Sequence, residues 1–592
     1  MLKKLFYVLL LTVSMVSQAQ EKIIKGIVSD VAGPLPGVSI LVEGTTNGTE
    51  TDFDGNYQIK AEKGSVLVFS FVGMKTVRKK VGKSTVINVL MEEDSLLEEV
   101  VVTSLGIKRS SKSLGYASSV IRIRGRNQIQ TRDSYKKINE NEFKKTEYSP
   151  LSTFSIDVDK ASYSNIRRMI NNGQKIPKDA VKIEEMINYF DYNYPQPKGE
   201  DPFSINTEVV QTPWNKDTRL VRIGLKGKEY KQNDLPASNL TFLIDVSGSM
   251  GNSNKLPLLK SAFRLLVNQL REQDKVAIVV YAGAAGVVLE PTSGVNKEKI
   301  LTALNNLEAG GSTAGGEGIE LAYKLAEENF SKKGNNRVIL ATDGDFNVGA
   351  SSNESMEKLI EEKRKSGVFL SVLGFGYGNY QDDKLEILAD KGNGNHAYID
   401  TMQEAQKVFG EEFGGTLYTI AKDVKIQVEF NPKKVQAYRL IGYENRLLND
   451  EDFVDDTKDA GELGSGHTVT ALYEVIPVGV KSRFLKKIPK LKYTKNLIEK
   501  NFSDELFTVK VRYKKPSGTK SKELVKVIKD NVVNPTSDMN FASAVALFGM
   551  YLRKSEYKNG AKVKDILELA QNGKKGDEFG YKAEFIRLVK SM

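Results

Sequence analysis

Five side chains in three short segments offer the oxygen atoms that a hard metal ion prefers. They are Asp245, Ser247, Ser249, Thr313 and Asp343. Mg²⁺ binds oxygen ligands in near-octahedral geometry and keeps several of its waters. The short side chains hold these oxygens close to the backbone, and the two aspartates add negative charge. The spacing therefore predicts a divalent-cation site, with Mg²⁺ as the expected ion and Mn²⁺ or Ca²⁺ as alternatives.

The surrounding elements predict a sheet that brings these segments to one edge. Between residues 238 and 419, apolar strands alternate with helical patterns, as in βαβ units around a parallel sheet. The predicted strands are Thr241–Asp245, Val276–Tyr281, Val338–Thr342, Val368–Leu373 and His396–Ile399. The predicted helices are Lys255–Gln273, Lys297–Leu307, Gly318–Asn329, Ser355–Lys365, Asp383–Asp390 and Met402–Ala421. Open α/β sheets bind ligands at the carboxyl ends of their strands, which is where these oxygens would meet.

In this order and spacing, the three segments resemble the metal-ion-dependent adhesion site of von Willebrand factor A domains. The resemblance implies a Rossmann-like domain with helices on both faces of a parallel sheet. It implies that Ser247, Ser249 and Thr313 bind the metal directly, whereas Asp245 and Asp343 act mainly through bound water. One coordination position would remain for a carboxylate on a protein partner, so the resemblance implies binding or adhesion without catalysis.

A plainer interpretation of the first segment stays open. Loops of this composition also end strands and begin helices, because short polar side chains accept hydrogen bonds from the first free amides of a helix. Asp245 would then merely end a strand, and Ser253 or Asn254 would cap the following helix.

The residues needed for common enzyme mechanisms are scarce. The chain has no cysteine and two histidines, His396 and His467, which lie among small polar residues and are expected to be structural. The glycine run 374–378 lacks the helix start and the downstream acid of a dinucleotide site. We find no nucleophile–base pair or phosphate loop in the sequence. We therefore expect no enzymatic activity and no organic cofactor.

The amino-terminal residues indicate export, and the net charge is unevenly distributed along the chain. Residues 1–20 have a basic start, an apolar core and a small-residue end, which predicts a signal peptide. The expected location is the periplasm, the outer membrane or the cell surface of a Gram-negative bacterium. The formal net charge is +11, and residues 108–145 hold 11 Lys/Arg against 3 Asp/Glu. This stretch predicts a solvated linker or a contact with an anionic envelope surface, and not nucleic-acid binding.

Residues 23–93 predict a small β-sandwich. Their polar and apolar residues alternate between turn signals. The segments Pro34–Val38, Gly44–Thr49 and Asp52–Tyr57 resemble carboxypeptidase-regulatory-like domains. Asp52, Asp54 and Asn56 alternate in the last of these, which favours a turn closed by side-chain hydrogen bonds over a calcium site.

Residues 94–146 predict a basic linker that carries a transporter-like segment. Leu97–Arg109 and Leu114–Ala117 resemble the TonB box of starch-utilisation-type outer-membrane transporters, and Ile121–Gly125 resembles a piece of their plug domain. No barrel of alternating strands follows, so the chain by itself is not expected to be a transporter. The segment is either an inherited linker or a strand that adds to a TonB-like energy-coupling protein.

Residues 147–237 and 420–592 resemble the flanking regions of a family of exported bacterial proteins with a von Willebrand A domain. The resemblance rests on Tyr148–Tyr163, on Ile183–Tyr192 and on the carboxyl-terminal pattern. It implies that the two flanks form one β-rich scaffold that holds the A domain between them. Alternation around Asp157 and Asp159 predicts a half-buried strand.

The remaining predicted elements of the flanks follow from the same patterns. A helix is expected over Ser162–Asn172. Strands are expected over Val424–Phe430 and Leu506–Tyr513, and helices over Phe541–Tyr551, Val563–Leu569 and Tyr581–Val589.

Two functions compete on this evidence. The first is a metal-dependent adhesion or protein-binding role in the cell envelope, in which the metal site binds an acidic residue of a partner protein. The alternative is an accessory or regulatory subunit of a TonB-linked envelope assembly. The fold class is predicted to be multidomain α/β plus β in both cases.

Overall fold

The computed structural model describes residues 22–30, 33–35, 37–43, 45, 47–52, 54–71, 74–92, 132–231, 234–311, 315–344, 353–412, 418–485, 502 and 504–592. They fall into two compact units, one before and one after the boundary between Thr131 and Arg132. The predicted signal peptide and the TonB-box-like segment lie outside the described residues. None of the helices in the described ranges is both long enough and apolar enough to span a membrane.

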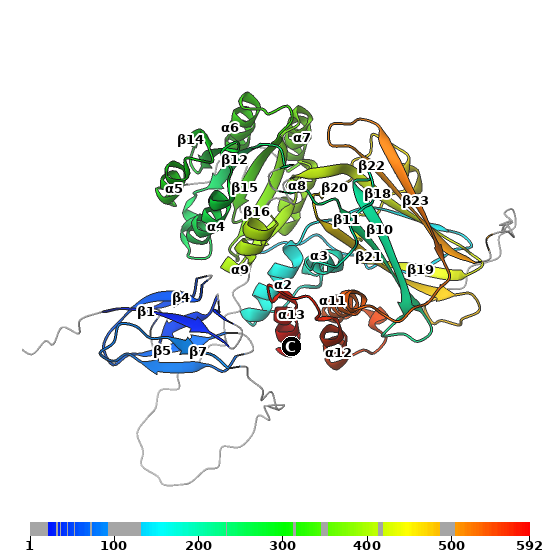
Figure 1. The fold of residues 1–592 in the computed structure, drawn as a ribbon, viewed down its shortest axis with the longest axis horizontal. Helices are drawn as coiled ribbons and strands as arrows, with labels where there is room; N and C mark the ends of the chain where they lie inside the picture. The colour runs from blue at the N-terminus through cyan, green and yellow to red at the C-terminus, as the bar shows by residue number, and fades with distance from the viewer. Residues whose placement is uncertain are drawn as a thin grey trace, which may run out of the picture. The chain divides into compact units, whose positions relative to one another are not determined.

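The first unit is the predicted β-rich unit, drawn in blue in Figure 1. One sheet has the order β4-β1-β7, from Asn56–Ala61, Lys22–Ser29 and Val89–Leu90. The other has the order β3-β2-β5-β6, from Gly48–Glu50, Ser39–Val42, Val66–Ser70 and Val77–Lys80. Alternate side chains of β2, β4 and β5 are buried in one apolar core, as the period of two in a strand requires.

The alternating polar residues of this unit form the predicted turn. The backbone N–H of Asn56 donates to Oδ1 of Asp52 at 2.6 Å, and its side-chain amide donates to Oδ2 of Asp52 at 3.3 Å. Both carboxylate oxygens of Asp52 therefore hold the turn. The turn interpretation is confirmed by these hydrogen bonds.

The second unit contains the predicted parallel sheet, drawn in green in Figure 1. Its order is β14-β13-β12-β15-β16-β17, from Ala285–Ser293, Lys275–Tyr281, Ser238–Asp245, Asn335–Thr342, Phe369–Phe375 and His396–Ile399. The five predicted strands are confirmed and all run parallel. The antiparallel edge strand β14 was not predicted, because only part of it is buried and its exposed Val287 and Val288 break the alternation.

Helices cover both faces of this sheet, as predicted. One face packs against α4 (Leu256–Gln269), α5 (Lys297–Asn305) and α9 (Met402–Ala405). The other packs against α6 (Gly315–Glu328), α7 (Asn353–Lys363) and α8 (Asp382–Lys391). This is the doubly wound arrangement in which each strand is buried on both sides.

The last predicted helix of this domain is wrong in its second half. Helix α9 continues as a π-helical turn over Gln406–Glu411, and the chain is a strand again over Thr419–Phe430. Ile420, Ala421 and Val424 are spaced as on a helix face, but they are buried as part of strand β18. Pairing with strands distant in the sequence decides between the two structures here.

The two flanks of the A-type domain share one β-sandwich. Its first sheet has the order β10-β11-β21-β19-β8, from Phe203–Gln211, Arg219–Gly227, Thr468–Pro477, Val435–Ile441 and Lys144–Lys145. The second has the order β20-β18-β22-β23, from Gly461–Gly464, Thr419–Phe430, Glu505–Lys514 and Ser521–Lys529, with β9 (Leu151–Ser155) paired to β18. Figure 1 shows β10 and β11 from the first flank beside β21 from the second.

The register of this sandwich joins residues on either side of the inserted domain. Val221 of β11 pairs with Tyr473 of β21, and Phe154 of β9 pairs with Ile426 of β18. Residues 132–146, the end of the predicted linker, also pack on this unit, since Lys145 of β8 pairs with Ala437 of β19. The prediction of one scaffold built from both flanks is confirmed.

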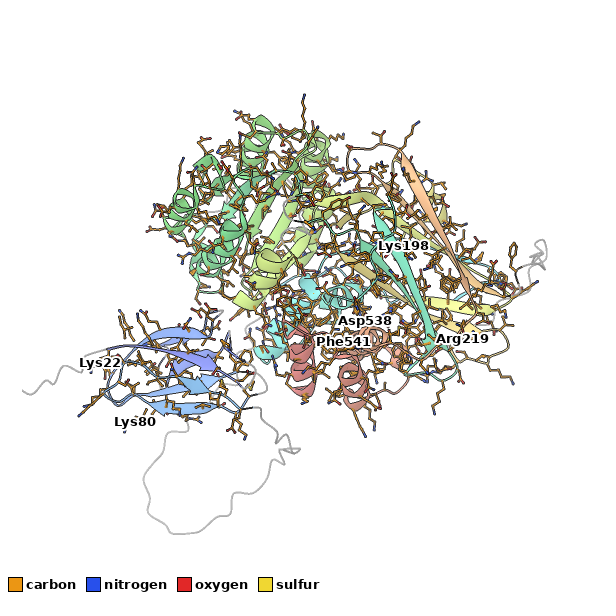
Figure 2. All side chains as sticks on the ribbon, in the orientation of Figure 1. Lys22, Lys80, Lys198, Arg219, Asp538 and Phe541 are labelled. Carbon is orange, nitrogen blue, oxygen red and sulfur yellow. The ribbon has the colours of Figure 1, made fainter. Side chains whose placement is uncertain are left out.

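A group of helices completes the scaffold. It consists of α2 (Ala161–Asn171), α3 (Ile183–Asn188), α11 (Ser537–Arg553), α12 (Val563–Gly573) and α13 (Tyr581–Lys590). Phe541, labelled in Figure 2, meets Phe190 and Phe585 with ring centroids 4.8 and 5.4 Å away. These edge-to-face contacts tie the carboxyl-terminal helices to the first flank.

The half-buried strand predicted around Asp157 is wrong. Strand β9 ends at Ser155, and both Asp157 and Asp159 are buried beyond it. Arg446 explains their burial, because its guanidinium lies 3.2 Å from a carboxylate oxygen of each. Buried carboxylates of this kind persist only when paired.

Buried ion pairs join the A-type domain to the scaffold. Lys182 of the scaffold lies 2.7 Å from Asp382 and 3.1 Å from Glu386 of helix α8, and 2.9 Å from Glu185 on its own side. Arg446 also reaches Glu386 and Asp390 of that helix. Lys182 and Arg446 lower the pKa of Glu386 to about 2 even though burial alone would raise it. The joint therefore depends on two cations held among several buried carboxylates.

Replacing Lys182 should destabilise this joint strongly. In Lys182→Met, the carboxylates of Glu185, Asp382 and Glu386 lose their shared ammonium, and removing one partner of a buried pair costs about 3–5 kcal/mol. The free energy of unfolding, measured by urea denaturation of the full chain, should fall by that order. Lys178→Met is the matched control, because Lys178 is exposed on the same segment. Equal losses in the two variants would contradict the role of Lys182.

Candidate metal centre

The first and third predicted metal-binding segments leave the sheet where its strand order reverses. Strand β12 lies between β13, which follows it in the chain, and β15, which returns on its other side. The loops after β12 and β15 therefore diverge at the carboxyl edge of neighbouring parallel strands. Such a switch point is the usual ligand-binding position in an open α/β sheet.

The first segment is folded around the carboxylate of Asp245. Oδ1 of Asp245 accepts the backbone N–H of Ser247 at 2.9 Å, and Oδ2 accepts the hydroxyl of Thr342 at 3.2 Å. The hydroxyl oxygens of Ser247 and Ser249 lie 3.1 Å apart. Asp245 and Ser247 are buried while Ser249 is exposed, so these oxygens form a short path from the sheet edge to solvent.

The negative charge of this segment, on the carboxylate of Asp245, lies in a buried position. Burial raises the pKa of Asp245 to about 6, and the neighbouring carboxylate of Asp343 adds to the rise, while hydrogen bonds from Ser247 and Thr342 oppose it. Asp343 directly follows β15 and is fully buried. A neighbouring negative charge of this kind disfavours the ionisation of Asp245 unless a cation stands beside it.

The second segment, which begins at Gly310, is attached to the first through backbone hydrogen bonds. Gly310 donates its N–H to the carbonyl of Val246 at 2.8 Å, and Gly248 donates to the carbonyl of Gly311 at 3.1 Å. Gly311 has a φ of +80°, a conformation that suits glycine. Thr313 lies outside the described residues, two positions after this attachment.

A lysine that the sequence patterns did not indicate lies beside Asp343, in the third segment. The ammonium of Lys255 is 2.8 Å from Oδ2 of Asp343 and 3.3 Å from Oδ1 of Asn379. Lys255 precedes helix α4, which has no side-chain cap, so the alternative in which Ser253 or Asn254 caps this helix is wrong. A lysine at the start of a helix carries no signal of burial in the sequence, yet this one is buried.

The fold keeps space for the stem of Lys255. Gly376, in the loop after β16, has a φ of +72°, and a Cβ there would lie 2.3 Å from Cε of Lys255. A larger residue at this position would push the lysine away from Asp343. The placement of Lys255 therefore depends on the presence of glycine at position 376.

The donor set fits a hard divalent cation. Within the described ranges no group of three His, Cys, Asp or Glu side chains could hold a metal ion, so a site of the zinc type is not formed there. Two carboxylates and two serine hydroxyls instead suit Mg²⁺, which takes oxygen ligands and water. Among the described residues of the site, Asp245 and Asp343 set against Lys255 leave one formal negative charge.

Both histidines are buried and neutral in character, as expected for structural residues. Burial lowers the pKa of His396 to about 4, and its Nε2 lies 2.9 Å from the hydroxyl of Tyr380. Its backbone N–H donates to Asp159, so it belongs to the joint with the scaffold. Burial likewise lowers the pKa of His467 to about 4.

Family models match most of the chain. Residues 239–411 match the von Willebrand factor type A domain, and residues 129–222 match a further model described as von Willebrand factor. Residues 415–592 match the carboxyl-terminal region of the uncharacterized protein YfbK. Residues 24–102 match the CarboxypepD_reg-like domain.

Individual relatives agree with these matches. The uncharacterized protein YfbK of Escherichia coli (strain K12) is 44% identical over 464 residues, which is 77% of this chain and 80% of that protein. TonB-dependent receptor P26 of Formosa agariphila is 45% identical over 104 residues, 18% of this chain and 10% of the receptor. A von Willebrand factor type A structure from Catenulispora acidiphila is 16% identical, covers 66% of this chain and 89% of that chain, and has a TM-score of 0.36.

Removing Lys255 should make the stability of the domain depend on a divalent cation. In Lys255→Met, Asp343 keeps a buried charge without its ammonium, so the unfolding free energy in EDTA should fall by about 3 kcal/mol. Mg²⁺ should restore much of this loss, because an ion that binds only the folded state stabilises it. The measurement is the Tm of the full chain with EDTA and with Mg²⁺.

The matched control is Lys260→Met, on the same helix. Lys260 donates to the backbone carbonyl of Asn305 and forms no ion pair in the described part of the chain. Its Tm should respond to Mg²⁺ as the parent does. A Lys255→Met protein whose Tm in Mg²⁺ equals that in EDTA would contradict the prediction.

Proposed function

We propose, for a chain that belongs to the family of the uncharacterized protein YfbK, that its von Willebrand A domain binds a partner protein through a divalent cation. Domains of this type are commonly adhesion or protein-interaction modules. The observation that carries the proposal is the arrangement of Asp245, Ser247 and Ser249 around one another at the strand switch point, with Asp343 directly after the neighbouring strand β15.

The residues have distinct tasks in this proposal. Ser247 and Ser249, with Thr313 of the second segment, would bind the ion, and Asp245 and Asp343 would hold its water molecules. When bound, Mg²⁺ supplies a positive centre that can accept one further oxygen ligand. Asp245 fixes the serine loop through the N–H of Ser247 whether or not an ion is present.

The charge balance favours an acidic partner group. The described site carries one negative charge, so a divalent ion would turn it into one positive charge at a buried sheet edge. A carboxylate that reaches the ion is then attracted in a region of low dielectric, where charge interactions are strong. A single such contact is small compared with the cost of association, and surrounding surface contacts must supply the specificity.

We also propose an envelope location for this interaction, on the basis of the signal-peptide pattern of residues 1–20. The family model and the relatives favour a binding role over catalysis. The partner would be a protein that presents an exposed Asp or Glu in the periplasm or at the cell surface.

The proposal is tested by metal binding and by partner capture. Asp245→Asn and Ser249→Ala should weaken Mg²⁺ binding by at least roughly tenfold, measured by calorimetry on the full chain, because each removes part of the donor set. Both should also lose any envelope protein that the parent captures in Mg²⁺ and releases in EDTA.

Ser261→Ala is the matched control for the serine variant. Ser261 lies on helix α4 of the same domain and donates to the backbone carbonyl of Pro257, away from the metal centre. It should bind Mg²⁺ and the partner as the parent does. Unchanged Mg²⁺ binding in both Asp245→Asn and Ser249→Ala would overturn the proposal.

A second candidate function is an accessory role in a TonB-linked assembly. The observation in its favour is the likeness to TonB-dependent receptor P26, which covers 10% of that receptor. Residues 98–107 would add a strand to an energy-coupling protein of the TonB type. This segment lies outside the described residues.

Deleting residues 98–107 tests this second candidate. The deletion should weaken association with a TonB carboxyl-terminal domain by at least roughly tenfold, because backbone pairing supplies most of the affinity of an added strand. Surface plasmon resonance with the immobilised TonB domain measures it. A parent protein that shows no association rejects the candidate, and Asp245→Asn should leave any association unchanged.

A further inference from the structure

We infer that Asp133 is a positioning residue of the metal centre, and that it acts through the loop 376–382 and Lys255. The inference rests on the proposed function, since it concerns the affinity of that centre for its ion. We call residues 132–134 the strap and residues 376–382 the edge loop. The strap is the point at which the chain enters the larger unit.

The backbone of the strap is paired with the edge loop. Arg132 donates its N–H to the carbonyl of Gly378 at 2.9 Å, and Ser134 donates to the carbonyl of Tyr380 at 2.9 Å. Asp382 returns a hydrogen bond to the carbonyl of Ser134 at 3.1 Å. The strap therefore forms an isolated parallel bridge with the edge loop, between Ser134 and Gln381.

The side chain of Asp133 fixes the middle of the edge loop. Its Oδ1 accepts the backbone N–H of Gly378 at 2.9 Å and that of Tyr380 at 3.0 Å. Its Oδ2 lies 3.3 Å from the guanidinium of Arg168, and both side chains are almost fully buried. One carboxylate thus holds the amides on either side of Asn379. Charge-assisted hydrogen bonds of this kind are stronger than neutral ones.

The edge loop in turn holds the cation of the metal centre. Oδ1 of Asn379 accepts from the ammonium of Lys255 at 3.3 Å, and that ammonium lies 2.8 Å from Asp343. The loop also packs on the residue after Asp343, since a Cβ at Gly344 would lie 2.7 Å from the backbone nitrogen of Gln381. A continuous set of contacts therefore leads from Asp133 to Asp343.

In this arrangement, docking of the strap and binding of the metal ion oppose each other. Lys255 and the water molecules of a divalent ion both need the carboxylate of Asp343, so a loop that keeps Lys255 in place weakens the binding of the ion. Linkage requires that the ion, in turn, weakens the docking of the strap. Undocking of the strap would then raise the affinity of the metal centre for its ion.

The test compares Mg²⁺ affinities of full-length variants by calorimetry. Asp133→Asn should bind Mg²⁺ roughly three- to tenfold more tightly than the parent, the usual range for a coupling residue. Asn379→Ala, which breaks the last contact and leaves the strap in place, should do the same. In the Lys255→Met background, Asp133→Asn should have no further effect, because the competing cation is gone.

The matched control is Asp179→Asn. Oδ1 of Asp179 accepts the backbone N–H of Ile138 at 3.0 Å. It therefore holds the segment that follows the strap without touching the edge loop. It should bind Mg²⁺ as the parent does. Affinities of Asp133→Asn and Asn379→Ala equal to the parent's would overturn the inference. An equal effect of Asp133→Asn with and without Lys255 would also overturn it.

A second readout separates this inference from the proposed function. Hydrogen exchange of the amides of residues 376–382, measured in EDTA, should become at least roughly tenfold faster in Asp133→Asn and stay unchanged in Asp179→Asn. A parent that binds no Mg²⁺ overturns the proposed function. The metal-free exchange then still decides whether Asp133 holds the edge loop, and unchanged exchange overturns that role.

Discussion

The larger unit depends on backbone pairing between strands that precede and follow the A-type domain. Strand β11 pairs with β21 over eight residue positions, from Arg219 with Val475 to Lys226 with Thr468. Strand β9 pairs with β18 in the same way. Because both ends of the inserted domain leave strands of one sandwich, the domain is held at two points. This constraint lets buried side chains, rather than a flexible linker, fix its orientation.

The charged joint follows from that constraint. Lys182 and Arg446 place two cations against helix α8. Arg167 adds a fully buried guanidinium that contacts Asp400, just before α9, and Glu404 within α9. Such pairs add little net stability compared with apolar contacts, but a wrong docking would leave their charges unpaired and buried. The ion pairs therefore select one orientation of the domain. The edge that carries the metal centre is fixed by the same choice.

The metal centre repeats this use of a buried cation on a smaller scale. Asp343 is fully buried, and the ammonium of Lys255 lies 2.8 Å from its carboxylate. The same lysine links the centre to the edge loop and to the point where the chain enters the unit. The side chain of Lys255 thereby connects the folding of the domain and the affinity of the centre for its ion with the strap.

The sequence by itself determined the elements whose signal is local. The periodicity of apolar residues predicted the five parallel strands and the helices between them, and the order of Asp245, Ser247, Ser249 and Asp343 indicated one edge of the sheet. Only the tertiary structure decided the formation of strand β14, the change from helix to strand at Thr419, and the ion pairs of Asp157 and Asp159. It also decided the contact of Lys255 with Asp343 and that of Asp133 with Gly378. Lys255 and Asp343 are 88 positions apart, and Asp133 and Gly378 are 245 apart. Local spacing carries no information on such pairs, because only the folded backbone brings them within hydrogen-bonding distance.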